Sequence, residues 1–563
     1  MDYKLEIADM LATAVGLDRD ELLASVEVPT DANLGDYAFP CFKLAKAAKK
    51  APNQIAAELA GGIKPGAAFE RLAATGPYLN FFVNKASYAE NILKRALTKN
   101  YGGGADNGKT VVIDYSSPNV THEFHIGHLF STVIGAALYR MYDFLGYEVV
   151  RINYIGDWGT QFGKLLYAFT TWSSPEALDK NGLDELTNVY VRFHNEAEVN
   201  KDLHDEARKW LVRLEAGDEA AVSLWQRFCR ICLDSMEKTY RRLGVEFDHY
   251  RGESYYNDKM DAVVAELRAK NLLIESDGAQ IVDLEPYKMP ACLILRSDGG
   301  TLYPTRDIAA ALDRMRSFPF HKALYVTDMR QSLHFAQFFK VLALMGYDWA
   351  ADLVHIPYGL LSLETGPLSS RKGNIILLED FFDESARRIL DIINERNPEL
   401  ADKERVAEDV GVGAVVFGAL YTSRIKDVVF SWDKALNFDG ETGPYVQYTH
   451  ARAGSVLAKS ANMQIDAANP DYNALTDPAS FDLLKSLDAF PDKVREAADK
   501  YEPFILSRSL VAIAQAFNKF YHDNPILASQ GGVRQGRLAL VKATKDVLKT
   551  GLALLGIKAP DQM

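Results

Sequence analysis

Cysteine is scarce in this sequence, and no apolar stretch is long. Four cysteines in 563 residues are too few for a disulfide framework, which favours a reducing compartment such as the cytoplasm. Residues 1–17 mix acidic with apolar side chains and do not fit a signal peptide. No charge-free run is long enough to span a bilayer. We therefore expect a cytoplasmic protein without a membrane segment.

The one CxxC pair, Cys229 and Cys232, has two possible interpretations. No second cysteine or histidine pair stands at zinc-finger spacing, and the pair lies in a helical apolar pattern. Buried structural cysteines are therefore favoured over a metal site, and no protein-bound metal is predicted.

Positive charge is also in deficit, because 63 basic residues face 76 acidic ones and the formal net charge is −13. This balance argues against indiscriminate binding to polyanions, which needs clustered lysine and arginine. RNA binding stays open, since an acidic protein can carry a local basic groove. The length and a hydrophobic content of 48% predict a globular protein of three or four domains.

The apolar pattern divides the chain into an α+β start, an α/β middle and an all-α end. Residues 1–105 alternate helical patterns with a strand and end in a glycine-rich linker. Residues 106–380 predict a doubly wound parallel-sheet domain of the Rossmann type, with a helical insertion around 165–250. Residues 381–436 predict a helical connector, and residues 437–563 a helical bundle.

Six segments of the middle region have the short apolar pattern of strands. The last four are expected to form the second half of the parallel sheet. In chain order the segments are VVIDY (111–115), YEVVRINYIGDWG (147–159), QIVDL (280–284), ACLILRS (291–297), KALYVTD (322–328) and VHIPYG (354–359).

The sequence His125-Ile126-Gly127-His128 follows a strand and a loop and opens a helix. A helix N-terminus offers unpaired N–H groups to phosphates, and Gly127 allows a flat base to approach the backbone. His125 and His128 share one helix face. The pattern predicts a nucleotide site, and its alternative is an ordinary polar helix start.

A basic loop, LSSRKGN, follows about 240 residues later, just past a strand. Its hydroxyls and cations, from Ser369, Ser370, Arg371 and Lys372, suit a phosphate on which charge develops during reaction. In isolation, the loop could equally be a solvated surface turn.

Motifs along nearly the whole chain resemble the class I arginyl-tRNA synthetases. SSPN before the HIGH sequence and GDWG after it are specific to that family within class I. The motifs, in the family's order, are DYSSPNVTHEFHIGH (114–128), INYIGDWGTQFGKL (152–165), TLYPTRD (301–307), QSLHFAQFF (331–339), LSSRKGN (368–374) and GPYVQYTHARA (443–453).

The resemblance implies an arginine–tRNA ligase. Such an enzyme uses ATP to convert L-arginine into arginyl-adenylate and transfers the arginyl group to the 3′ end of tRNA(Arg), releasing AMP and pyrophosphate. Mg²⁺ would be carried with the ATP substrate. The expected partners are thus tRNA(Arg), L-arginine and ATP, with no membrane, and the expected state is a monomer.

Site residues are carried over from the family by motif. The arginine site would comprise Asp114, Ser117, Asn119, His125, Tyr303, Asp307 and Gln331. The ATP site would comprise Asn119, His125, Gly127, His128, Ser369, Arg371 and Lys372. Of these, His125, His128, Ser369, Arg371 and Lys372 would be catalytic. The acids and amides suit the five donors of a guanidinium, although Asp114 could instead cap a strand end and Asp307 a helix.

The flanking regions are implied to bind tRNA. The N-terminal domain would grip the D-loop, with Tyr78 as a stacking face and Asn80 as an amide, although Tyr78 could simply be core. The C-terminal bundle would bind the anticodon. Its candidate contacts are Tyr445, Tyr448, Arg452 and Met563.

The chain departs from the family at the positions of its basic groups. His122 stands where many members have a lysine, and Ser370 replaces the second lysine of the KMSKS loop. Phe130 stands where arginine is common, and Glu123 where proline is common. These departures keep two alternatives open: a non-catalytic paralogue that binds tRNA, and another HIGH-type nucleotidyltransferase.

Overall fold

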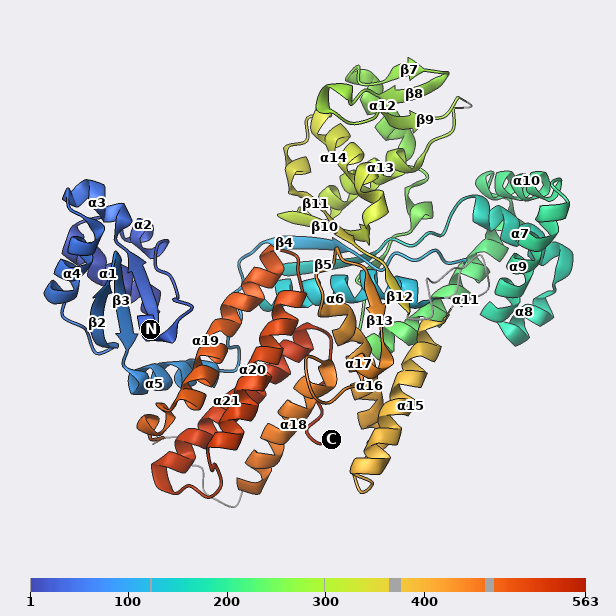
Figure 1. The fold of residues 1–563 in the computed structure, drawn as a ribbon. Helices are drawn as coiled ribbons and strands as arrows, with labels where there is room; N and C mark the ends of the chain where they lie inside the picture. The colour runs from blue at the N-terminus through green and yellow to red at the C-terminus, as the bar shows by residue number, and fades with distance from the viewer. Residues whose placement is uncertain (1, 122–123, 298, 364–375, 461–469) are drawn as a thin grey trace. The chain divides into compact units, whose positions relative to one another are not determined.

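The structure is a computed structural model that describes residues 2–121, 124–297, 299–363, 376–460 and 470–563 (Figure 1). The chain forms two compact units, each assembled from separate segments. The first comprises residues 1–101, 452–489 and 512–547, and the second comprises 102–451, 490–511 and 548–563.

The second unit contains a five-stranded parallel sheet in the order β11-β10-β4-β5-β6. Its strands are β4 (Thr110–Asp114), β5 (Glu148–Asn153), β6 (His249–Tyr250), β10 (Lys322–Asp328) and β11 (Leu353–Tyr358). The order of connection reverses between β4 and β10. Such a reversal opens a crevice at the carboxyl ends of the two strands, where ligands bind. The predicted doubly wound fold is confirmed.

Helices cover both faces of this sheet. α6 (Leu129–Phe144) lies on one face, and α13 (Tyr303–Ser317) and α14 (Ser332–Leu344) lie on the other (Figure 1). Successive side chains of a strand point to opposite faces, so Val112 and Tyr325 join the apolar core under α13 and α14.

The predicted helical insertion between β5 and β6 is present. It consists of α7 (Thr160–Trp172), α8 (Pro175–Asn181), α9 (Leu183–Val199), α10 (Leu203–Glu215) and α11 (Glu219–Leu243). Cys229 and Cys232 lie in α11, and burial raises the pKa of both thiols. α11 ends at Gly244, whose φ of 59° is the left-handed conformation that closes many helices.

Two predicted strands belong to a different sheet. β8 (Ala279–Val282) and β9 (Cys292–Leu295), from QIVDL and ACLILRS, pair antiparallel beside β7 (Ile274–Ser276). The expectation that they continue the parallel sheet was wrong. Asp277 and Gly278 both have positive φ, at 50° and 76°, and so fold β7 onto β8 as a tight hairpin.

Several shorter elements lie around the two sheets of the second unit. They are η3 (Glu253–Tyr256), α12 (Met260–Ala269), η4 (Glu285–Tyr287), η5 (Met329–Gln331) and η6 (Asp348–Asp352).

Beyond residue 376 the described residues are mostly helical, in agreement with the helical pattern predicted after about residue 380. The helices are α15 (Leu378–Arg396), α16 (Lys403–Leu420), α17 (Trp432–Ala435), α18 (Gly443–Ser460), α19 (Pro478–Asp499), α20 (Phe504–Asp523) and α21 (Gly531–Leu554), with η8 (Tyr472–Leu475) before α19. One short strand, β13 (Val428–Phe430), was not predicted and pairs in parallel with β12 (Leu361–Leu363). None of the described helices combines the length and apolarity that crossing a membrane requires.

The first unit contains the N-terminal α+β fold. Its antiparallel sheet has the order β1-β3-β2, with β1 (Tyr37–Pro40), β2 (Phe69–Thr75) and β3 (Tyr78–Val83). The accompanying helices are α1 (Tyr3–Val15), α2 (Arg19–Leu23), η1 (Ala32–Leu34), α3 (Phe42–Ala48), α4 (Pro52–Gly62) and α5 (Lys85–Ala96). Buried aromatic side chains such as Phe39, Phe69 and Phe81 fill its core.

Candidate active site

A strained turn follows β4 at the switch point of the parallel sheet. Ser116 and Ser117 have φ values of 68° and 47°, a left-handed conformation that costs non-glycine residues energy and is common at functional sites. The N–H of Ser116 donates to Oγ of Ser131 at 2.9 Å, and that hydroxyl donates to the Val326 carbonyl of β10 at 2.9 Å. The first turns of α6 therefore tie the carboxyl ends of β4 and β10 together.

The HIGH sequence forms η2 (Ile126–His128), directly before α6. Nδ1 of His125 accepts the N–H of Gly127 at 3.0 Å, and Nδ1 of His128 accepts the N–H of His125 at 3.2 Å. The two ring centroids are 4.1 Å apart. A neutral imidazole that accepts at Nδ1 carries its proton on Nε2, and an Nε2–H is a donor of the kind that phosphate oxygens accept.

Gly127 is required by this arrangement. A Cβ at this position would lie 2.7 Å from Cε1 of His125, closer than real contacts allow. The glycine thus lets the imidazole fold back over the helix start.

The chain returns to the HIGH sequence after the basic loop. The N–H of Ile126 donates to the carbonyl of Ile376 at 3.2 Å, and the N–H of Leu378 donates to the carbonyl of Phe124 at 3.0 Å. Ile376 is four residues after Lys372. The predicted loop residues Ser369, Ser370, Arg371, Lys372 and Gly373 themselves lie outside the described residues, as do His122 and Glu123.

A cavity of about 430 Å³ opens at the carboxyl edge of the sheet. Six residues of the predicted arginine site line it: Asp114, Ser117, Asn119, Tyr303, Asp307 and Gln331. His125, the seventh, is not among the lining residues, and neither are Gly127 and His128. Side chains that were not predicted complete the wall, among them Tyr154, Glu253, Arg314, Thr327, His334 and Phe338.

Asp307 is held in the cavity wall by two side chains. Its Oδ1 accepts the hydroxyl of Tyr154 at 3.1 Å, and its Oδ2 lies 2.5 Å from Nε2 of His334. The alternative that Asp307 is a helix N-cap does not apply, because α13 begins at Tyr303, with Leu302 as its N-cap. Its carboxylate is thus fixed in place by Tyr154, which follows β5, and by His334 of α14.

Asp114, in contrast, already has a cationic partner. Its Oδ2 accepts Nη2 of Arg314 at 2.7 Å, and its Oδ1 accepts the hydroxyl of Ser117 at 2.7 Å. Burial raises the pKa of Asp114, and the Arg314 guanidinium opposes that rise. Arg314 is only 1% exposed, so this ion pair is internal and largely cancels the charge of Asp114.

Three family models match the chain, and together they span most of it. The model of the catalytic domain of class I (R) tRNA synthetases matches residues 90–432. The DALR anticodon binding domain matches residues 446–563, and the N-terminal domain of arginyl tRNA synthetases matches residues 1–83.

Relatives cover the chain from end to end. Arginine–tRNA ligases of Alkaliphilus metalliredigens and Clostridioides difficile are 51% and 49% identical to it, over the whole of each chain. The chain belongs to the class I arginyl-tRNA synthetases. The arginyl-tRNA synthetase structure from Thermus thermophilus agrees, with 29% identity, a TM-score of 0.84 and full coverage of both chains. Nothing in these matches supports the alternative of a non-catalytic paralogue.

Glu253 is the main acid of this synthetase cavity that sequence analysis missed. It follows β6 at the same sheet edge, and its carboxylate lies 3.1 Å from Nη1 of Arg306. Burial raises its pKa to about 7, and Arg306 opposes the rise. The segment RGESYY gave no signal of its own, because a strand of two residues is too short for an apolar pattern.

The GDWG segment of the synthetase fixes neighbouring parts of the cavity. A Cβ at Gly156 would lie 1.9 Å from Oδ1 of Asn119, so only glycine allows this amide its position. Asp157 accepts the N–H and the hydroxyl of Ser254 at 2.8 and 2.6 Å. These bonds anchor the residue next to Glu253.

Phe130, a departure from the usual arginine of the synthetase family, is part of the core. It is 2% exposed, and its ring packs edge-on against Tyr358. This position therefore offers no phosphate contact.

The predicted tRNA contacts lie in very different surroundings. Tyr78 opens β3, is partly exposed and packs edge-on against Phe42, whereas Asn80 is buried at 2% exposure. Tyr445, Tyr448 and Arg452 share one face of α18, and Tyr448 is 37% exposed. Met563 packs beside the apolar cluster of α15 and α16, and its carbonyl accepts Nδ2 of Asn397 at 3.2 Å.

Proposed function

We propose that this chain is an arginine–tRNA ligase, which activates L-arginine with ATP and transfers it to the 3′ end of tRNA(Arg), releasing AMP and pyrophosphate. The observation that carries the proposal is an acidic cavity and a pair of imidazoles at the carboxyl edge of the same sheet, in a chain half identical to curated arginine–tRNA ligases over its full length.

The substrate guanidinium binds Asp307, and Glu253, which is paired with Arg306, adds negative charge to the same wall when it is ionised. Asp307 is held by the Tyr154 hydroxyl and by His334, and no lysine or arginine in the described parts of the chain pairs with it, so its negative charge is available to a cation that enters. Glu253 lies in the same wall. A guanidinium has five donors in a rigid fork and needs several acceptors around it. Tyr303, at the cavity mouth, offers a ring face, and the amides of Asn119 and Gln331 serve the polar end of the amino acid.

Asp114 acts through its neighbours rather than on the substrate. Its negative charge is neutralised by Arg314. Its second carboxylate oxygen accepts a hydrogen bond from the Ser117 hydroxyl and so orients that side chain. We assign it a positioning role for the wall of the arginine site.

ATP binds at the start of α6. The Nε2–H groups of His125 and His128 and the N-terminal backbone of the helix face its phosphates, and Gly127 and Asn119 leave room for the nucleoside. Ser369, Arg371 and Lys372 close over the phosphates from the loop that rejoins the chain at Ile376. Mg²⁺ is carried with the ATP. The arginine carboxylate then attacks the α-phosphate in line, and positioning and charge supply most of the catalysis.

Transfer RNA is gripped by three segments. Residues 1–105 bind the D-loop through Tyr78, and Asn80 stabilises the strand that carries it. Residues 381–436 contact the stem of the tRNA. Residues 437–563 bind the anticodon. In this last segment Tyr445, Tyr448 and Arg452 present one helix face, and Met563 supports it.

The catalytic segment comprises residues 106–380, and its helical insertion lies around residues 165–250. We propose that the protein works as a monomer in the cytoplasm.

A charging assay tests the proposal. Each of the twenty amino acids is offered with ATP and bulk tRNA, and radioactive aminoacyl-tRNA is measured. Only arginine is expected to be charged. Charging of another amino acid, with arginine inert, would overturn the assignment.

A further inference from the structure

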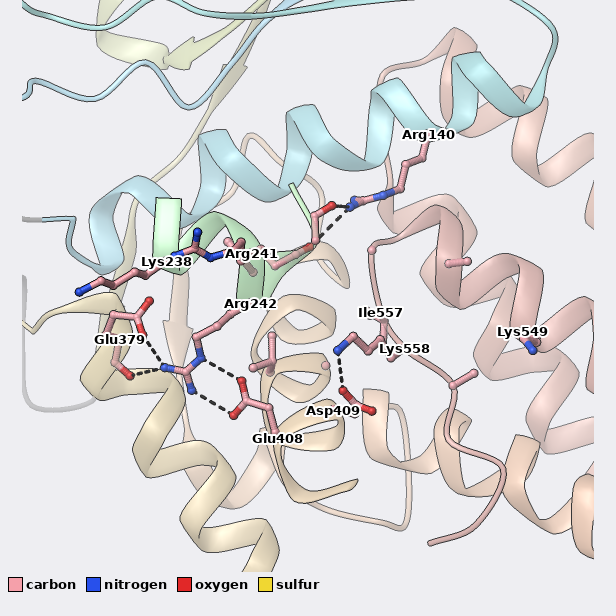
Figure 2. A pocket seen from close by; sticks show the side chains of 17 residues that line it. Arg140, Lys238, Arg241, Arg242, Glu379, Glu408, Asp409, Lys549, Ile557 and Lys558 are labelled. Carbon is pink, nitrogen blue, oxygen red and sulfur yellow. Dashed lines mark hydrogen bonds and ion pairs between the residues drawn. The ribbon is translucent and has the colours of Figure 1, made fainter. Parts of the chain in front are cut away.

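A second and larger cavity, of about 710 Å³, lies away from the arginine site. Its walls come from the ends of α6 and α11, the start of α15, the middle of α16, and the chain at and after the end of α21 (Figure 2). Arg140, in its wall, is twelve residues beyond His128 on α6, which places it about 18 Å along the helix axis. We call this space the basic cavity.

Positive charge predominates in the basic cavity, although the whole chain carries −13. Three acids line it: Glu379, Glu408 and Asp409. Six cations line it: Arg140, Lys238, Arg241, Arg242, Lys549 and Lys558. The lining therefore has a formal charge of 6 − 3 = +3.

The acids are already engaged by two of the cations. Arg242 bridges Glu379, at 2.7 Å, and Glu408, at 2.9 Å, and Lys558 pairs with Asp409 at 2.8 Å (Figure 2). Each acid thus has a cationic partner.

The remaining cations are not neutralised by the cavity wall. The Arg140 guanidinium donates to the carbonyl of Gly244 at 2.7 Å, which leaves its charge uncompensated. Lys238, Arg241 and Lys549 are exposed, and within the described parts of the chain no hydrogen bond or ion pair engages their side chains. Lys238 and Arg241 come from α11, on the opposite side of the cavity from Lys549 (Figure 2). Cations that converge from two sides attract an anion with more than one charge.

The rest of the lining, which we call the floor, is apolar. Leu243, Val412 and Ile557 line it, together with the glycines Gly244, Gly413 and Gly556. Gly556 has a φ of 77°, which disfavours any side chain there, and a Cβ would also displace the Arg140 guanidinium, whose Nη1 would lie 2.4 Å away. Such a floor suits a sugar or base beside the phosphates.

The rim of the cavity is joined to the helix that carries the proposed anticodon contacts. Nε2 of Gln447, next to Tyr448 in α18, donates to the carbonyls of Asp409 at 3.1 Å and of Lys558 at 2.8 Å. Two residues of the cavity lining are thus bonded to α18, while α6, which follows the HIGH sequence, contributes Arg140 to another part of it.

We propose that the basic cavity is a second phosphate-binding site, separate from the ATP site. Its ligand is the phosphodiester backbone of RNA or the phosphate groups of a free nucleotide, and both offer the same chemistry to Lys238, Arg241 and Lys549. The position beside α18 favours RNA, and this source rests on the proposed function.

The experiment compares two double variants of the full-length chain. Arg241→Ala/Lys549→Ala removes two cations of the cavity. Arg230→Ala/Lys180→Ala is the matched control, because it removes two exposed cations outside the cavity, from α11 and α8. Binding of bulk tRNA is measured by filter retention at several salt concentrations, and binding of tripolyphosphate is measured by calorimetry.

RNA backbone binding predicts that the cavity variant loses roughly tenfold in tRNA affinity, and that its salt slope becomes shallower by about 0.7 to 0.9 per lost phosphate contact. The control should keep the wild-type slope. If only tripolyphosphate binding is lost, the site is supported and its ligand is a free nucleotide. If neither measurement differs from the control, the proposal fails. Arginine charging by the wild type tests the proposed function separately, since it does not depend on either variant.

Discussion

At the scale of single residues, Glu253 makes arginine binding depend on pH. Its pKa is raised by burial to about 7, so the carboxyl group is mostly protonated at pH 6 and mostly charged at pH 8. A guanidinium is charged throughout this range and binds the ionised form. The KM for arginine should therefore rise about tenfold between pH 8 and pH 6, measured at saturating ATP and tRNA.

The control for this pH effect is Glu253→Gln, which keeps the shape and removes the titration. Its KM should be high and nearly constant over the same range. A Gln variant with the wild-type pH profile would assign the titration to another group.

Asp307 is expected to supply most of the attraction for the guanidinium. Asp307→Asn leaves a buried guanidinium without its ionic partner, which costs about 2–4 kcal/mol and lowers kcat/KM for arginine roughly 30- to 1000-fold. ATP affinity should hardly change.

His334→Ala removes a side chain that holds the Asp307 carboxylate but keeps the carboxylate itself. This variant should raise the KM for arginine by a smaller factor than Asp307→Asn does, and His334→Gln should restore part of the loss.

A site residue can be predicted from the sequence when it lies within a contiguous motif. A residue that only the fold brings into the cavity leaves no such pattern. Asp307 and Asn119 lie in long motifs and were found. The pairing of Asp114 with Arg314 joins residues two hundred positions apart, so no local pattern reveals that the charge of Asp114 is cancelled. Glu253 and His334 were missed as cavity residues because the fold brings them there.

At the scale of the element, the turn after β5 depends on the absence of a side chain at Gly156. A methyl group there would push the Asn119 amide out of the cavity wall. Gly156→Ala should therefore raise the KM for arginine at least tenfold, as steady-state charging kinetics would show.

Gly61→Ala is the matched control for the steric effect. Gly61 lies in α4, has no other atom within 4 Å of its missing Cβ and has no positive φ. This change should stabilise the helix by about 0.5–1 kcal/mol and leave kinetics unchanged. If Gly156→Ala behaves in the same way, the Asn119 contact is not needed for arginine binding.

The strands β8 and β9 show that an apolar pattern can predict a strand without predicting its sheet. QIVDL and ACLILRS were correctly predicted as strands, but pattern cannot say which sheet a strand joins. The pair Asp277-Gly278 was the available signal, because Asp-Gly between short apolar runs favours a two-residue hairpin. A hairpin of this kind excludes the parallel pairing that the doubly wound fold demands.

At the scale of the whole molecule, the two compact units predict separate thermal transitions. A ligand that binds only the native state stabilises the part that holds its site, by about 2.7 kcal/mol at a hundredfold excess over Kd. The arginine cavity is formed by the second unit alone. In calorimetric scans, L-arginine should therefore raise the temperature of one transition, while L-lysine, which lacks the planar fork, should raise neither.

The Asp307→Asn variant is the control. It should lose the arginine-induced shift and keep both transitions. An equal shift of both transitions by arginine would mean that the units unfold as one, and the cavity could then not be assigned to either unit by its stability.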